Sequence, residues 1–492
     1  MVESRVGAER VLLACILTWI STWGRVSMQP PPPNPQIEGA QIEAFITSQI
    51  RHHNLPGLAL AVVQGNEILH LQGYGEARAG APVTERTQFF LASLSKSFTA
   101  LAVLQLVEAG AVGLDQPVQR YLPELALRDA EAAAGLRVRH LLNHTSGLGD
   151  WSFTELRLSQ ARTPVERLQE LQGARLLSPP GESYAYTNPN YEILARLVEV
   201  ASGQDFSAYL AEHVFGPLGM EDTFHANHTS EALLRAGSPA QGHVHAYGVP
   251  IALEELNGYI GGSAGVISTA RDMASYLLFQ IRPGQPGVPT LLSPELLALA
   301  RTPPSGIDTQ YGMGWVVREQ DGQRILEHNG ILSVFYAELM LLPDLEAGFV
   351  LLYPANSLAA TAIAYTQNKA GLLQLLTGRA PASGGFSLVH WGLAAGALTA
   401  ASLLLSVFGQ LRAGKPAARP RRLWQTLLAL LWNLLPAALL AALPALASLG
   451  SGRVFGYAAL GRAMPEVFLW LGTLAVSGLL HAARRISGLR DW

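Results

Sequence analysis

A serine and a lysine three residues apart are the first residues whose types and spacing could support catalysis. They are Ser93 and Lys96, in the segment 93–111, whose periodicity predicts a helix that ends near Gly113. At this spacing both side chains lie on one helix face and can hydrogen-bond. Ser93 would lie at the helix N-terminus, where the dipole favours developing negative charge, and Lys96 would be the adjacent base. Because the same pair also occurs on ordinary surface helices, an activated serine needs support from other segments.

Two further segments carry groups that suit an activated serine. Tyr186 and Asn188 form a Y-x-N element, and at a spacing of two in an extended segment a phenol and an amide can face one cleft. The tyrosine can pass protons, and the asparagine can hold a lysine or a substrate amide. Gly330 opens onto a strand, where glycine lets the backbone approach a substrate closely, and the N–H of Ile331 could serve an oxyanion hole.

The elements that must position these groups follow a mixed pattern. Residues 57–75 alternate around a turn at 64–66, as a β-hairpin does. Residues 114–256 are mostly helical in pattern, and strand patterns return at 324–327, 334–342 and 348–353. Strands at both ends with helices between them predict one α+β domain, residues 39–378, whose sheet is built from both termini and which includes a helical subdomain.

The order of these segments resembles a known family, the class C β-lactamase-like serine hydrolases, which include penicillin-recognising enzymes, D-aminopeptidases, D-alanyl-D-alanine carboxypeptidases and esterases. The resemblance covers residues 40–358, and its motifs succeed one another in the family's order. They lie at 93–100, 114–118, 121–123, 138–148, 186–188, 217–220, 268–273 and 311–315. The resemblance implies a β-lactamase/transpeptidase-like fold, with an antiparallel sheet flanked by helices.

The resemblance also implies a role for each residue named above. Ser93 would be the acylated nucleophile, Lys96 its proton acceptor and Tyr186 the second general acid/base. Asn188 would hold Lys96 and the substrate amide. The oxyanion hole would consist of the N–H groups of Ser93 and Ile331.

One motif departs from the β-lactamase pattern. His328-Asn329-Gly330 stands where β-lactamases carry Lys-Thr-Gly, so His328 and Gly330 are expected to line the substrate site without the lysine that binds a substrate carboxylate. Because histidine is mostly neutral at pH 7, efficient β-lactam hydrolysis is not expected. The family's peptidase and esterase branches, in which H-x-G is common, are the better match.

Charge and composition argue against several other classes of protein. The formal net charge is −3, but residues 1–380 carry −11 and residues 381–492 carry +8. The acidic part would repel phosphates, so no nucleic-acid partner is expected. Cys15 is the only cysteine, which excludes a disulfide framework and a cysteine zinc site. His140 and His144 lack the glutamate of a zinc protease, and no third ligand accompanies His243 and His245. We therefore expect neither a metal nor an organic cofactor.

The two ends of the chain have patterns typical of segments directed to a membrane. Residues 1–27 resemble a signal peptide, with a short apolar stretch at 11–20, and residues 28–38 form a proline-rich spacer. After a flexible linker at 379–386, residues 387–411 and 423–449 carry no charge, and a shorter apolar stretch covers 465–483. These lengths predict an all-α transmembrane region over 387–483, followed by a tail at 484–492.

Basic residues suggest how this region crosses the bilayer. The 412–422 loop holds five positive charges and no negative ones, and three arginines follow residue 483. The positive-inside rule places both segments in the cytoplasm. The first helix then runs inward and leaves residues 39–378 outside, as the signal peptide independently requires.

These observations favour a membrane-anchored, extracytoplasmic serine hydrolase that acts on a small peptide, amide or ester. Candidate substrates are D-amino-acid peptides, cell-wall fragments and small esters. One alternative is a slowly acylated β-lactam or peptide sensor whose helices transmit the event, although no cytoplasmic output domain is evident. Another is a catalytically silent scaffold. Turnover, a stable acyl-enzyme and absence of labelling would distinguish the three.

Overall fold

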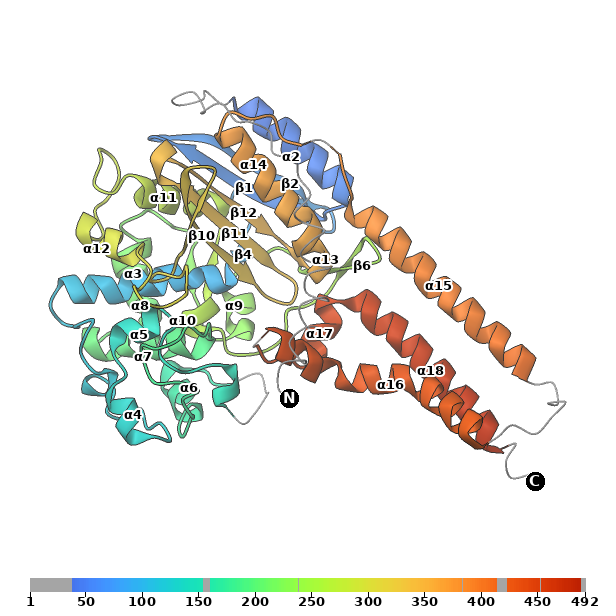
Figure 1. Cartoon of the computed structure of the whole chain (residues 1–492). Helices are drawn as coiled ribbons and strands as arrows, with labels where there is room; N and C mark the ends of the chain where they lie inside the picture. The colour runs from blue at the N-terminus through green and yellow to red at the C-terminus, as the bar shows by residue number, and fades with distance from the viewer. Residues whose placement is uncertain are drawn as a thin grey trace.

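The computed structural model describes residues 38–153, 160–237, 239–382, 384–413, 423–451 and 453–487. The signal peptide predicted at 1–27, nearly all of the spacer at 28–38, and parts of the basic segments 412–422 and 484–492 lie outside these residues. Figure 1 shows an α+β body from which three long helices project together.

A seven-stranded antiparallel sheet forms the centre of the α+β body. Its strand order is β3 (Ala81–Pro82), β2 (Glu67–Arg78), β1 (Gly57–Gln64), β12 (Ala347–Tyr353), β11 (Tyr336–Leu342), β10 (Gln323–Ile331) and β9 (Val316–Gln320). The β1–β2 hairpin and strands β10, β11 and β12 were predicted, whereas β9 was not. β1 pairs with β12 in the register Ala59↔Leu352, which confirms that the sheet is built from both ends of the domain.

Both faces of this sheet are covered because side chains alternate along each strand. Leu58, Leu60 and Val62 of β1 pack in a cluster with α2 (Gly39–His53) and α14 (Thr366–Leu376). Ala59, Ala61 and Val63 face the opposite way, into the larger core that holds α3 (Ser95–Glu108) and α11 (Ala270–Ile281). The catalytic candidates of α3 therefore lie on the α11 side of the sheet, away from α2 and α14 (Figure 1).

The segment between β2 and β9 is mainly helical, as predicted. After β4 (Phe89–Phe90) and α3, its helices are α4 (Ala130–Ala134), α5 (Val138–Leu142), α6 (Pro164–Glu170), α7 (Asn188–Ser202), α8 (Phe206–Leu210), α9 (Thr229–Arg235), α10 (Gly261–Ala264), α11 and α12 (Pro294–Ala300). Short strands interrupt them: β5 (Phe224–His225), β6 (His243–Ala246), β7 (Val249–Ala252) and β8 (Val266–Ser268). β4, β8 and β5 form one small sheet, and β13 (Ala355–Asn356), β6 and β7 form another.

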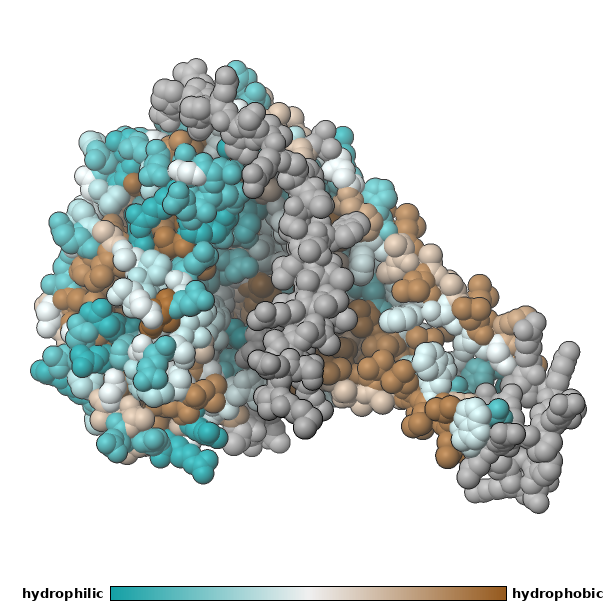
Figure 2. All heavy atoms as spheres, viewed as in Figure 1, coloured by the Kyte–Doolittle hydropathy of each residue, from teal (hydrophilic) through white to brown (hydrophobic). Residues whose placement is uncertain are grey.

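Three apolar helices follow the domain: α15 (Leu388–Ala413), α16 (Leu423–Ser451) and α18 (Pro465–Ser487). Their spans Leu388–Leu411, Trp424–Leu449 and Pro465–Arg484 are long and apolar enough to cross a membrane. Figure 2 shows hydrophobic residues along the surface of this projection. A short helix, α17 (Tyr457–Ala463), lies between α16 and α18. The three helices predicted at 387–411, 423–449 and 465–483 thus match α15, α16 and α18.

Side-chain contacts establish the direction of these helices. Trp470 donates to the Ser402 hydroxyl over 3.1 Å, and Gln410 donates to the Ser477 hydroxyl over 3.2 Å. Because these pairs keep the same order along both helices, α15 and α18 run in parallel, and α16, which comes between them in the chain, packs on α18 and runs the opposite way. The end of α16 and the start of α18 therefore lie beside the α+β body, whereas the end of α15, the start of α16 and the end of α18 lie at the far end of the projection (Figure 1).

A close contact between α7 and α10 brings the site's backbone into place. Thr99 of α3 donates to the Gly262 carbonyl over 2.6 Å. An added Cβ at Gly262 would lie 2.5 Å from the Tyr191 carbonyl oxygen and 2.6 Å from the Ala195 Cβ. Only glycine allows α10 to sit between α3 and α7 at this distance.

Substituting Gly262 tests this packing. We expect Gly262→Ala to destabilise the fold by about 1–3 kcal/mol, because the added methyl must displace backbone on α7. The measurement is the thermal unfolding midpoint of the full chain in detergent. Gly237→Ala is the matched control, since its Cβ would meet nothing within 4 Å. Equal midpoints for the two variants would contradict the packing account.

Candidate active site

Lys96 lies at the centre of a buried hydrogen-bond cluster with Ser93. Ser93 sits in a single turn, Ala92–Leu94, directly before α3, and Lys96 in the first turn of α3 is fully buried. The Lys96 Nζ lies 3.1 Å from the Ser93 Oγ, 2.9 Å from the Asn188 Oδ1 and 3.0 Å from the Ser263 carbonyl oxygen. The structure thus brings together the predicted serine, lysine and asparagine.

This arrangement decides what a neutral Lys96 can do. An amide oxygen and a carbonyl oxygen can only accept, so Asn188 and Ser263 take two N–H groups of Lys96. In a neutral amine the remaining position is a lone pair, and Ser93 is the partner left to face it. Burial lowers the pKa of Lys96 well below its usual value, and the nearby Arg453 cation lowers it further. The geometry and the electrostatics therefore both suit a base that accepts the Ser93 proton.

Tyr186 completes the group around Ser93. Its hydroxyl hydrogen-bonds with the Ser93 side chain, and its ring centroid lies 4.9 Å from the Lys96 Nζ. Burial raises the pKa of Tyr186, so the phenol is protonated at neutral pH and can donate to a leaving group. Two residues later, Asn188 begins α7, whose extended N-cap is Thr187 and whose first turn contains Pro189.

The turn before Ser93 is held in an uncommon conformation. Ala92 has φ of +50°, in the left-handed region that costs a residue with a Cβ about 1–2 kcal/mol. Gly330 at the end of β10 packs against this turn, since a Cβ there would lie 1.9 Å from the Leu91 carbonyl oxygen. The backbone that Gly330 approaches so closely is thus the turn that carries Ser93. Ile331, the next residue, is 51% exposed.

His328 lies beside this group but its polar atoms point elsewhere. Its Nδ1 lies 2.7 Å from the Asn329 carbonyl oxygen, so this nitrogen must carry the proton and donate. Burial lowers the pKa of His328 to about 4. The ring is therefore neutral at pH 7, and its Nε2 accepts the hydrogen bond from the Tyr311 hydroxyl at 3.0 Å. The structure places His328 in the wall of the site, with both nitrogens satisfied by protein.

Four groups near the site were not singled out from sequence. Tyr311 fixes His328, and the Ser263 carbonyl binds Lys96. Asp150 accepts a hydrogen bond from Thr187 over 2.8 Å, and Arg453 pairs with Asp150 over 2.6 Å. In the sequence Arg453 is only an isolated positive charge, and nothing near it in the chain identifies Asp150 as its partner.

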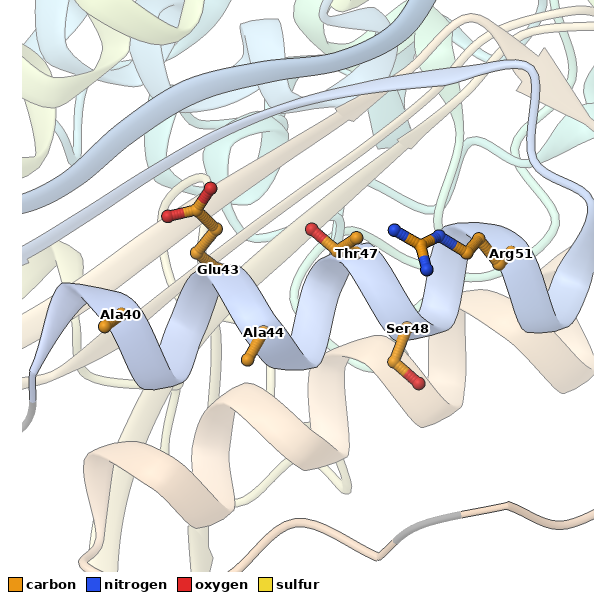
Figure 3. Close-up of a pocket in the computed structure, with 6 residues that line it drawn as sticks. All are labelled: Ala40, Glu43, Ala44, Thr47, Ser48 and Arg51. Carbon is orange, nitrogen blue, oxygen red and sulfur yellow. The ribbon is translucent and has the colours of Figure 1, made fainter.

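Other parts of the structure are weaker candidates for a catalytic or metal-binding site. Across the described ranges, no three His, Cys, Asp or Glu residues are placed to hold a metal ion. Figure 3 shows a surface pocket lined by Ala40, Glu43, Ala44, Thr47, Ser48 and Arg51, all from α2. Glu43 and Ser48 point to different sides of the helix there, so they do not form a nucleophile–base pair. The Ser93 group remains the candidate active site.

Comparison with known proteins agrees with this assignment of the fold. The family model described as Beta-lactamase matches residues 42–374. Esterase EstB of Burkholderia gladioli is 32% identical over 311 residues, which are 56% of this chain and 77% of the esterase. Penicillin-binding protein 4* of Bacillus subtilis (strain 168) is 31% identical over 56% of this chain, which spans 63% of that relative's length. The penicillin-binding protein from Bacillus halodurans has a TM-score of 0.55 at 25% identity, over 67% of this chain and 98% of its own. The family match contains every predicted site residue and ends before α15.

Four buried histidines predict an acid-sensitive fold. Burial lowers the pKa of His53, His225, His245 and His328 from 6.5 to about 4. Between pH 6.5 and 4 the unfolded chain binds protons that the folded chain does not. The free energy of unfolding therefore falls as the pH falls, by up to about 1.4 kcal/mol per pH unit for each histidine. We expect the thermal unfolding midpoint to drop steadily across this window.

The contribution of His328 is measured with His328→Gln, which cannot titrate. We expect the slope of the midpoint against pH to become shallower, with a similar reduction for His245→Gln at the other end of the domain. A His328→Gln slope as steep as that of the unsubstituted protein would show that His328 is not held neutral by burial.

Proposed function

The chain belongs to the beta-lactamase family of serine hydrolases, and on this basis we propose that it is a membrane-anchored, extracytoplasmic hydrolase that cleaves amide or ester bonds through an acyl-enzyme on Ser93. The observation that carries the proposal is the buried Lys96 amine, which contacts Ser93 while Asn188 and Ser263 occupy its other N–H groups. The chemistry requires side chains and water alone.

The reaction follows from the roles of these groups. The Ser93 Oγ attacks the substrate carbonyl carbon, and its proton passes to Lys96. The N–H groups of Ser93 and Ile331 stabilise the negative charge on the carbonyl oxygen. Tyr186 donates a proton to the departing amine or alcohol, which leaves an ester on Ser93. Water then attacks that ester and gives a proton to Tyr186, the bond between the acyl group and the Ser93 Oγ breaks, and Lys96 returns its proton to the Ser93 oxygen as the acid leaves.

The substrate class follows from the wall of the site. Position 328 holds a neutral, fully hydrogen-bonded ring where a lysine would supply a positive charge. This favours small esters, D-amino-acid amides and cell-wall peptide fragments over efficient β-lactam hydrolysis. The similarity to an esterase of Burkholderia gladioli and to penicillin-binding proteins supports the same range of substrates.

Anchoring and orientation rest on the three apolar helices. The ends of α15, α16 and α18 that border the basic segments 412–422 and 484–492 lie away from the α+β body (Figure 1). With those segments in the cytoplasm, the body lies on the opposite side of the bilayer. The helix arrangement therefore supports an extracytoplasmic catalytic domain.

Labelling with a fluorophosphonate tests the nucleophile. We expect the full chain in detergent to be labelled and to hydrolyse p-nitrophenyl esters or D-amino-acid amides, with poor turnover of a chromogenic cephalosporin. Ser93→Ala should abolish labelling and lower turnover by about a thousandfold or more. Ser48→Ala, on the outer side of α2, is the matched control and should match the unsubstituted protein.

Each other outcome assigns a different function. Labelling that survives Ser93→Ala would refute the catalytic assignment. A stable acyl-enzyme without turnover would instead support the sensor hypothesis, and a folded protein without labelling would support a scaffold.

Cysteine accessibility tests the orientation. In a Cys15→Ser background, a cysteine at Gly456, which is exposed between α16 and α17, should react with a membrane-impermeant maleimide on intact cells. A cysteine at Lys415, between α15 and α16, should react only after the cells are permeabilised. The reverse pattern would overturn the proposed topology.

A further inference from the structure

The connection between α16 and α17 contacts the α+β body at the active site. The Arg453 Nε lies 2.6 Å from the Asp150 Oδ2, and the backbone N–H of Val454 donates to the same oxygen over 3.2 Å. The Asp150 side chain is 14% exposed and that of Arg453 is 34% exposed. A partly buried, two-point contact of this kind holds its residues more firmly than an exposed ion pair.

Asp150 also contacts the Y-x-N element. Its second oxygen accepts a hydrogen bond from the Thr187 hydroxyl over 2.8 Å. Thr187 is fully buried and lies between Tyr186 and Asn188 in the chain. One carboxylate therefore links the connection to the residue that separates the two predicted active-site groups.

Arg453 also contacts Tyr186 directly. Its guanidinium carbon lies 5.2 Å from the centroid of the Tyr186 ring, on the ring face. A cation at this distance is attracted by the aromatic ring, and the contact restricts the orientation of the ring. The Lys96 Nζ lies 4.9 Å from the same centroid, so Tyr186 lies close to both the amine of Lys96 and the guanidinium of Arg453.

The helix that follows the connection, α17, contacts the β10 side of the site. Arg462 of α17 donates to the Ser333 hydroxyl over 2.9 Å and to the Glu254 carbonyl. Ser333 follows Ile331 by two residues, beyond the end of β10. The connection therefore contacts the Y-x-N side of the site, and α17 contacts the β10 side.

We propose that the α16–α17 connection is part of the active site and that Arg453 is a positioning residue, which holds Tyr186 through Asp150 and Thr187 and keeps a positive charge beside Lys96. The proposal rests on the function proposed above. It assigns to the C-terminal region, which lies outside the family match, a role in the reaction besides anchoring.

The positive charge of Arg453 and two nearby carboxylates have opposite effects on the pKa of Lys96. Among the described residues, the titratable and charged side chains that surround Lys96 are Tyr186, Tyr191, His144, His328, Glu192, Asp150 and Arg453. Glu192 and Asp150 raise the pKa of Lys96, whereas Arg453 lowers it. Removing the cation alone leaves both carboxylates, so Lys96 then loses its proton at a higher pH.

The pH dependence of acylation tests this assignment. The probe is a fluorophosphonate, and its rate of reaction with Ser93 is measured in the full chain from pH 5 to 10. In a plot of this rate against pH, the rate rises as Lys96 loses its proton. For Arg453→Gln we expect this rising limb to move up by about one pH unit and the rate at pH 7 to fall about tenfold. Arg453→Lys keeps the charge and should leave the limb in place, with a smaller loss of rate from the altered contact with Tyr186.

Control variants separate positioning from general stability. Arg379→Gln breaks a surface ion pair with Asp321, 3.0 Å long, and should change neither limb nor rate. Thr187→Val breaks only the link to Asp150, so it should lower the rate without moving the limb. Thermal unfolding midpoints are measured for every variant.

Distinct results would overturn the proposal. An Arg453→Gln profile that coincides with that of the unsubstituted protein would remove Arg453 from the site, although labelling at Ser93 would still support the proposed function. Should Arg453→Gln not fold, Arg453→Met, which keeps the apolar stem against Tyr186, takes its place. Loss of folding in both variants would assign Arg453 a purely structural role. Absence of labelling in the unsubstituted protein would instead refute the proposed function.

Discussion

The buried amine of Lys96 is the constraint on which the rest of the site depends. A charged lysine is costly to bury, and a neutral one still needs partners for its two N–H groups and its lone pair. Three separate elements meet those needs: the turn before α3 supplies Ser93, α7 supplies Asn188 and α10 supplies the Ser263 carbonyl. The close packing of α10 on α7 at Gly262 is what brings the carbonyl within reach. The packing of these helices therefore places the hydrogen-bond partners of the Lys96 amine.

Local patterns in the sequence predicted much of this arrangement. Ser93 and Lys96 are three residues apart, Ser93 in the turn that leads into α3 and Lys96 in the first turn of that helix, and Tyr186 and Asn188 are two apart, so short-range geometry is enough to pair them. The hairpin and the late strands were predicted from their alternation, whereas two-residue strands such as β4 and β5 are too short to show a pattern. The Ser263 carbonyl carried no signal, because every residue has a carbonyl. In the sequence Arg453 is no more than one of several positive charges, because its partner Asp150 lies about three hundred residues earlier in the chain.

His328 and Arg453 together define the electrostatics of the site. The sequence already indicated that position 328 lacks a lysine, and the structure adds that its ring is neutral and satisfied by Tyr311 and Asn329. A positive charge is nevertheless present beside Tyr186, supplied from the other end of the chain by Arg453. Its position differs from that of a cation on β10, because it borders the Y-x-N side. Because the Arg453 cation lies in a different place from a lysine on β10, it would attract a different part of a substrate. This is consistent with a specificity different from that of β-lactamases.

The α+β body and the helices contact each other through several side chains. Glu466, at the start of α18, accepts a hydrogen bond from the Tyr247 backbone over 2.9 Å, and the Tyr247 hydroxyl lies 3.0 Å from that of Thr399 on α15. Arg453 follows the end of α16 by two residues and touches both Asp150 and Tyr186. Under the proposed topology, the residues that surround Ser93 therefore lie at the level where α16 leaves the bilayer. Of the three helices, α15 and α18 contact the body and α16 packs on α18, so the helices and the body are joined at several separate points.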